Sequence, residues 1–178
     1  MTSIKPTTSN QGAGTREWDA LPEGTYNAEV ARITYKPIDL DRTPWLNRLV
    51  DRGVKAQISF GFRITSGPFA KRWVWGDIPA EISDHSACKL RLYLQEILQE
   101  NTLPSDFSFD EADYDDYIGL PCRVRLGKYF SEKAGVERNS LDDVLSPTAK
   151  QLNEASGRTH IKSTPSVKSA PQEEWEPF

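Results

Sequence analysis

The segment from Val54 to Ile64 alternates between apolar and polar or small residues over its whole length. One parity holds Val54, Ala56, Ile58, Phe60, Phe62 and Ile64, and the other holds Lys55, Gln57, Ser59 and Arg63. A period of two places successive side chains on opposite faces of a β-strand. We therefore expect a strand with the first set facing a core and the second set facing outward.

Four further segments are expected to be strands: residues 25–35, 69–78, 120–130 and 140–145. In the first, the apolar parity changes after Val30, which predicts a bulge near Ala31. The second follows the turn Ser66-Gly67-Pro68 and is expected to pair back on residues 54–64 as a hairpin.

One helix is expected between the third and fourth strands. Its apolar residues recur at helical spacing: Ala87, Leu90, Leu94, Ile97 and Leu98. Ser83 or Asp84 can cap its start, and Asn101 and Pro104 end it near Glu100. Three strands, a helix and two strands is the order of an OB-fold, so the expected fold is mainly β, a five-stranded barrel with a helix between strands 3 and 4.

The two ends of the chain differ in composition from its middle. Residues 1–20 are rich in Thr, Ser, Gly and Gln without periodicity, and are expected to form a flexible arm. Residues 146–170 have almost no large apolar residue to offset the cost of ordering. The expected organisation is an arm at 1–20, an OB-fold domain at 21–147, and a disordered linker with an acidic tip at 148–178.

The charge of the chain is unevenly distributed. The formal net charge is -4, which argues against a generically basic nucleic-acid binder. Six acidic residues of the domain lie within residues 106–116, so the rest of the domain can still present a locally basic face. The absence of an apolar signal core or a long apolar stretch, together with two cysteines, predicts a cytoplasmic protein.

The third strand carries the first candidate binding residues. Lys71, Trp73 and Trp75 share one parity, while Arg72 and Val74 share the other, and either parity can face the core. If Val74 faces inward, both indole rings are exposed beside a cation. Flat rings with cations suit stacking of unpaired bases and neutralisation of phosphates.

The fourth strand carries a second basic and aromatic set. With Cys122, Val124 and Leu126 inward, the outward set is Arg123, Arg125 and Tyr129. A solvated surface explains such a pattern equally well when it stands alone. Because two strands carry such sets, we expect base stacking on Trp73, Trp75 and Tyr129. Phosphates are expected on Lys71, Arg72, Arg123, Arg125 and Lys128, with Lys55 and Arg63 at the margin.

Signals for catalysis are weak. Asp113, Asp115 and Asp116 could hold the metals of a nuclease, but they lie in a polar run without a strand-borne partner. Two histidines and two cysteines give no persuasive metal site or nucleophile, so no metal, cofactor or enzymatic activity is expected.

The last six residues, Glu173-Glu174-Trp175-Glu176-Pro177-Phe178, combine acidic and aromatic side chains at the end of a polar tail. This ending resembles the acidic, Pro-Phe-terminated tip of bacterial and phage single-stranded DNA-binding proteins. Residues 21–147 resemble small phage proteins of that type in three places: Leu21-Pro22-Glu23-Gly24-Thr25-Tyr26, Gly67-Pro68-Phe69-Ala70-Lys71-Arg72, and Asn139 followed by Val144-Leu145.

The resemblance implies sequence-nonspecific binding of single-stranded DNA during phage DNA replication or recombination, in the host cytoplasm. It implies that the tip recruits partner enzymes, and it leaves room for a homo-oligomer. Two alternatives stay open from the residues: a metal-dependent nuclease, and an adaptor whose OB-fold binds only protein.

Overall fold

A computed structural model describes residues 19–41, 44–83 and 88–157 of the 178-residue chain. Five strands form one antiparallel sheet: β1 (Gly24–Pro37), β2 (Ala56–Ile64), β3 (Trp73–Pro79), β4 (Pro121–Ser131) and β5 (Val136–Leu145). The helices are η1 (Pro44–Leu46), α1 (Asn47–Val50), α2 (Lys89–Leu98), η2 (Glu111–Asp113), α3 (Tyr114–Tyr117) and α4 (Ala149–Ser156). Within the described residues, no helix has the length and apolar character needed to cross a membrane.

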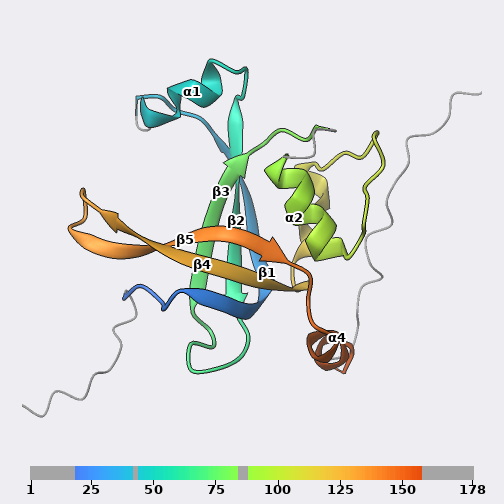
Figure 1. Ribbon diagram of the computed structural model, residues 1–178. Coiled ribbons are helices and arrows are strands. Elements are labelled where there is room, and N and C mark those ends of the chain that lie inside the picture. Colours follow the sequence, from blue (N-terminus) through green and yellow to red (C-terminus); the bar gives the residue numbers. More distant parts are fainter. Residues whose placement is uncertain (1–18, 42–43, 84–87, 158–178) are drawn as a thin grey trace, which may run out of the picture.

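The strand order in the sheet is β3-β2-β1-β4-β5, with every neighbouring pair antiparallel (Figure 1). The mainly β class, the five strands and the helix between the third and fourth strands are confirmed. The sheet is open, with β3 and β5 as its edges, so the closed barrel is not confirmed. These edges nevertheless approach one another: a Cβ built on Gly76 of β3 would lie 2.4 Å from Leu141 Cδ2 of β5.

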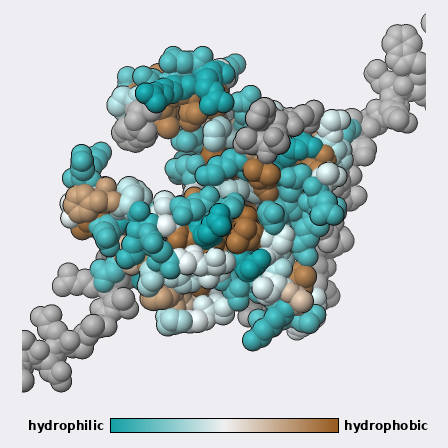
Figure 2. Space-filling view, in the orientation of Figure 1, coloured by the Kyte–Doolittle hydropathy of each residue, from teal (hydrophilic) through white to brown (hydrophobic). Residues whose placement is uncertain are grey.

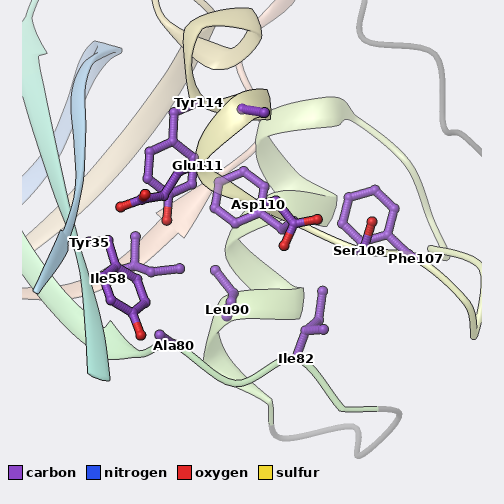
Figure 3. Close-up of a pocket in the computed structure, with 12 residues that line it drawn as sticks. Tyr35, Ile58, Ala80, Ile82, Leu90, Phe107, Ser108, Asp110, Glu111 and Tyr114 are labelled. Atoms are coloured by element: carbon purple, nitrogen blue, oxygen red, sulfur yellow. The ribbon is translucent and has the colours of Figure 1, made fainter. Parts of the chain in front are cut away.

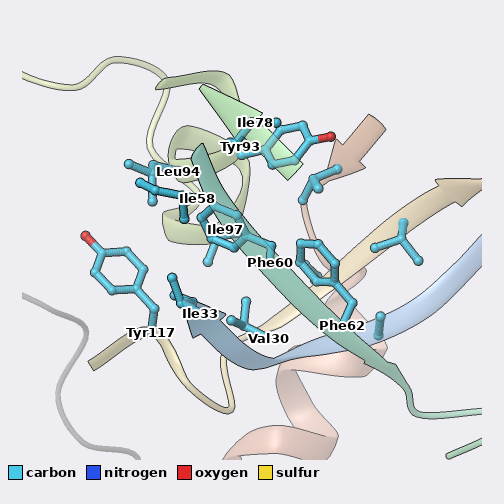
Figure 4. Packing of buried hydrophobic residues seen from close by; sticks show 14 of the residues in the cluster. Val30, Ile33, Ile58, Phe60, Phe62, Ile78, Tyr93, Leu94, Ile97 and Tyr117 are labelled. Atoms are coloured by element: carbon cyan, nitrogen blue, oxygen red, sulfur yellow. The ribbon is translucent and has the colours of Figure 1, made fainter. Parts of the chain in front are cut away.

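The core lies on the inward face of the sheet, where α2 covers it (Figure 4). The inward set of β2 is confirmed, because Ile58, Phe60, Phe62 and Ile64 are all buried, but Ser59, predicted to face outward, is buried as well. From α2, Tyr93 meets Phe60 edge to face at 6.1 Å between ring centroids. The predicted bulge in β1 is also confirmed, since the register with β2 shifts between Val30 and Arg32.

Some element boundaries differ from those predicted. The chain after the turn at Gly67 makes further turns before β3 begins at Trp73, four residues later than expected. The helix begins at Lys89, with Cys88 at its N-cap position, so the predicted cap at Ser83 is wrong. The alternative cap, Asp84, lies outside the described residues. The last strand begins at Val136 rather than Ser140, because it pairs with β4 along a long hairpin.

The prediction of a disordered linker from residue 148 is wrong for its first part, which forms α4. Thr148 and Gln151 make reciprocal capping hydrogen bonds at the start of this helix. The Gln151 amide also donates a 2.8 Å hydrogen bond to the Cys122 carbonyl oxygen in β4, and Gln151 is buried. The helix is therefore anchored by a polar contact, which a count of large apolar residues does not detect. Residues 158–178, including the acidic tip, lie outside the described residues, as does most of the predicted arm.

Asn139 of β5 joins two of the short motifs noted in the sequence. Its side chain accepts a 2.7 Å hydrogen bond from the Leu21 N–H and donates one of 2.9 Å to the Leu21 carbonyl oxygen. It also donates to the Gly127 carbonyl oxygen at 3.3 Å. One amide thus holds the entry to β1 against the β4–β5 hairpin.

Candidate functional site

The parity of β3 is settled by the burial of its residues. Val74 and Ile78 are buried in the core, whereas Trp73 and Trp75 are 45% and 47% exposed. The two indole rings stack on one another, with centroids 5.5 Å apart and planes 18° from parallel. The rings therefore form one aromatic platform on the outward face of the sheet, the first of the two arrangements considered from the sequence.

Gly61 of β2 makes room for this platform. It pairs with Trp75 across the β2–β3 ladder, and a Cβ at Gly61 would lie only 2.7 Å from Trp75 Cζ3. The indole therefore rests directly on the backbone of β2. Because a side chain at position 61 would push the ring away, the glycine allows Trp75 to lie this close to β2.

Lys71 and Arg72 lead into β3 from the turn. Lys71 has a left-handed backbone with a φ of 73°, and its N–H donates a 2.8 Å hydrogen bond to the Ile64 carbonyl oxygen. The Arg72 guanidinium donates to the Asp19 carbonyl oxygen at 2.6 Å. Lys71 is exposed and makes no ion pair within the described residues. Its ammonium is thus available to an anionic ligand.

The β4–β5 hairpin extends away from the body of the sheet, at the left of Figure 1. Tyr129, which is 49% exposed, pairs with Arg138 across the ladder. Apolar surface gathers near the end of this hairpin in Figure 2, where Phe130 and Val136 are exposed. The hairpin therefore presents rings and a cation to solvent.

A groove of about 880 Å³ runs between β3 and this hairpin. We call it the β3–hairpin groove. It is lined by Asp19, Ala20, Lys71, Arg72, Trp73, Val74, Trp75, Asp77, Leu126, Tyr129, Val136, Arg138, Asn139 and Leu141. The lining contains three basic residues and two acidic ones, Asp19 and Asp77. The Asp77 carboxylate forms an ion pair with Lys36, at 3.2 Å. The groove thus combines exposed rings with a modest excess of positive charge.

The structure brings together half of the predicted binding residues. Trp73, Trp75, Lys71, Arg72 and Tyr129 all line the β3–hairpin groove. The other five do not line it: Arg123, Arg125, Lys128, Lys55 and Arg63. On β4, only the end towards the hairpin turn reaches the groove with a predicted residue, because Tyr129 lines it whereas Arg123, Arg125 and Lys128 do not.

Four of these five cations have partners within the protein. Arg63 pairs with Glu29, Arg125 with Asp143 at 2.9 Å, and Lys128 with Glu137 at 3.3 Å. The Arg123 side chain donates a 2.8 Å hydrogen bond to the Ser146 carbonyl oxygen. Lys55 is exposed at the residue before β2 and makes no ion pair within the described ranges.

Arg138 and Val136 are groove residues that the sequence reasoning missed. Both precede the segment 140–145 that was predicted to be the last strand. Within 136–140, apolar residues do not alternate with polar ones, so the periodicity signal is absent. One sequence feature did indicate an earlier start of the strand. Gly135 lies shortly after Phe130, at the end of the preceding strand, and a glycine there is typical of a hairpin turn.

The acidic segment of residues 106–116 forms a separate structure. Asp110 and Asp113 cap η2 reciprocally, which gives both carboxylates a structural use. Within the described residues, no group of three or more His, Cys, Asp or Glu side chains could hold a metal ion. His85 and His160 lie outside those residues.

Comparison with known proteins adds no further identification. No protein-family model matches the chain, and no curated protein matches it. The function must therefore be argued from the groove itself.

Proposed function

We propose that this protein binds single-stranded DNA without sequence preference in the β3–hairpin groove. One observation carries the proposal. Two stacked and half-exposed indole rings lie beside Lys71, Arg72 and Arg138 in one groove. Every nucleobase has a face that can stack on an aromatic ring, so such a platform tolerates any sequence. A base pair in a duplex hides those faces, which favours an unpaired strand.

The position of the groove agrees with an OB-fold. In that fold, oligonucleotides lie on the face of strands 2 and 3 and on the loops joining strands 1 to 2 and 4 to 5. Here the platform is on β3 over Gly61 of β2, and Tyr129 and Arg138 come from the β4–β5 hairpin. We propose that the open sheet is a partly open OB-fold barrel, with Leu141 against Gly76 where its edges meet.

The proposed biological role, and the role of the C-terminal tip, are inferred from the sequence. The protein would act in phage DNA replication or recombination without catalysing a reaction itself. Its tip, Glu173 to Phe178, would recruit replication or recombination enzymes, with Trp175 and Phe178 as the apolar anchors. The resemblance stated above supports this part, which rests on residues outside those described.

A titration of a fluorescein-labelled dT oligonucleotide, followed by anisotropy, tests the binding proposal. The matched ligands are an rU oligonucleotide and a duplex of equal length, each at two salt concentrations. We expect the dT strand to bind more tightly than the duplex, and its affinity to fall with salt. Equal affinity for duplex and single strand, or no binding at low salt, would overturn the proposal. Cleavage of the oligonucleotide with Mg²⁺ or Mn²⁺ would favour the nuclease alternative.

A further inference from the structure

A second hollow lies on the molecule where the end of β1, α2 and η2 meet (Figure 3). It has a volume of about 660 Å³ and does not share a residue with the β3–hairpin groove. Its lining is largely apolar, with Ile58, Ile82 and Leu90 among the aliphatic side chains and Tyr35, Phe107, Phe109 and Tyr114 as the rings. We call it the α2–η2 pocket. This volume lies within the range of about 300–1,000 Å³ that is typical of protein ligand pockets.

The aromatic wall of the pocket is fixed by the core. Phe109 lies against Tyr114 and Tyr117, with ring centroids 5.0 Å away in each case. It also stacks on Phe60 of β2 at 6.3 Å, with ring planes 7° apart. Because Phe60 is fully buried, this wall is built before a ligand binds.

The charge at the pocket is negative. Asp110 and Glu111 line it, and none of the described lining residues is a Lys, Arg or His. The sequence from Leu92 to Cys122 contains several acidic residues and no basic one. Glu111 is exposed and makes no ion pair within the described part of the chain. A cation of a ligand placed at this rim would therefore be attracted by a carboxylate that no described basic side chain pairs with.

Tyr114 gives the pocket a polar group. Its side chain lies beside Glu111 in Figure 3, and the residue is only 9% exposed. Its hydroxyl makes no hydrogen bond to any described residue. Burial, and then the nearby Glu111 carboxylate, raise the pKa of Tyr114 to about 12. The hydroxyl thus stays protonated at physiological pH and can donate a hydrogen bond to a ligand.

We infer that the α2–η2 pocket docks a basic peptide segment of a partner protein. An apolar side chain of the segment would enter the pocket against Phe109 and Leu90. A neighbouring Lys or Arg would meet Glu111 and Asp110, and the Tyr114 hydroxyl would donate to a peptide carbonyl oxygen. The negative rim repels nucleic acid and anionic lipid surfaces, so charge favours a basic polypeptide over both. This inference does not depend on the proposed DNA binding.

A peptide library displayed on phage and selected against the full chain provides the test. We expect the selected peptides to carry Lys or Arg next to a large apolar residue. The affinity of the best peptide is then measured by anisotropy. Glu111→Lys should weaken binding about tenfold, because it replaces attraction with repulsion at the rim. Ala112→Trp, which places a ring at the pocket lining, should weaken binding at least as much.

Asp115→Lys is the matched control, since Asp115 is exposed in the same acidic segment but does not line the pocket. We expect it to weaken binding less than about threefold, by general electrostatics alone. The inference is overturned if no peptide is selected, if the selected peptides are acidic, or if Asp115→Lys weakens binding as much as Glu111→Lys. The Glu111→Lys variant should bind a dT oligonucleotide as tightly as the unchanged protein. A failure of the peptide test can then be told apart from a failure of the proposed DNA binding.

Discussion

The β3–hairpin groove and the α2–η2 pocket are both lined by aromatic rings, but the charged side chains beside those rings differ in sign. In the groove, Trp73 and Trp75 lie near Lys71 and Arg138. In the pocket, the rings lie near carboxylates and no described basic side chain joins them. Rings supply contact area to almost any ligand, whereas charge decides which ligand is attracted. The same sheet thus carries, at two separate places, rings beside mainly basic side chains and rings beside acidic ones.

The two sets of rings also differ in their connection to the core. Trp73 and Trp75 stack on each other and on a glycine, and about half of each residue is exposed. Phe109 instead packs on three other rings, one of which is fully buried. We therefore expect the groove rings to contribute to binding, and the pocket rings to contribute to stability as well.

The largest expected effect is on stability, from Phe109→Ala. Loss of this ring from its three neighbours should lower the free energy of unfolding by about 3 kcal/mol. Trp73→Ala should lower it by less than about 1 kcal/mol, because the ring is half-exposed. Urea unfolding followed by circular dichroism measures both. Equal losses in the two variants would remove the distinction between the two sets of rings.

The next effect is on DNA binding. Trp73→Ala and Trp75→Ala should each cost about 1–3 kcal/mol of affinity for a dT oligonucleotide. Phe109→Ala, measured at a temperature where it stays folded, should leave that affinity unchanged. Anisotropy titrations compare the three variants. Full affinity in both Trp variants would place the strand elsewhere on the sheet.

Gly61→Ala tests whether the close contact between Trp75 and β2 matters for binding. The new Cβ would lie 2.7 Å from the Trp75 ring, so the ring must shift, and we expect a cost of about 1 kcal/mol in DNA affinity. The control is the same substitution in a Trp75→Ala background, where it should cost nothing. Additive effects of the two substitutions would show that Gly61 does not act through the ring.

Salt dependence separates the groove cations from the cations paired within the protein. Lys71→Ala and Arg138→Ala should each flatten the plot of log affinity against log salt by about 0.7, the value for one phosphate contact on a single strand. Arg63→Ala and Arg125→Ala should leave the slope unchanged, since these side chains pair with Glu29 and Asp143 away from the groove. The opposite pattern would move the strand onto the outward face of β4.

A further effect is expected only at high pH and concerns the pocket. Burial raises the pKa of Tyr114 from 10.0 to about 12, so the folded state favours the protonated hydroxyl. This contribution is complete below pH 10 and is lost as the pH rises from 10 to 12. Urea unfolding at several pH values between 10 and 12 measures this loss. The free energy of unfolding should fall less with pH in Tyr114→Phe than in the unchanged protein. An identical loss in both would mean that Tyr114 does not titrate between the folded and unfolded states.

Much of the fold could be predicted from periodicity. The alternation in β2 and the change of parity after Val30 follow directly from the residues, because one face of each strand must be buried. The helix α4 could not be found in this way, since its buried anchor is the amide of Gln151. The start of β5 was missed because its hairpin leaves the core and its residues no longer alternate.

The candidate site was predicted only in part, for a related reason. Sequence spacing places residues on one face of one strand, so it correctly grouped Trp73 and Trp75, whereas Lys71 lines the groove from the turn before β3. It could not show which faces of distant strands meet. Arg125 and Arg138 are both cations of the β4–β5 hairpin, yet only Arg138 reaches the groove. The pairing of Tyr129 with Arg138 depends on a register that the sequence does not reveal.

The indole rings of the β3 platform can themselves report whether a DNA strand stacks on them. The chain has five tryptophans, and replacing Trp18, Trp45 and Trp175 by Phe leaves Trp73 and Trp75 as the only tryptophans, which are excited selectively at the red edge of their absorption. We predict that a dT oligonucleotide quenches the fluorescence of this variant, in proportion to the binding measured in parallel by anisotropy. Tight binding without any change in fluorescence would contradict the account, because the strand would then bind away from the β3 platform.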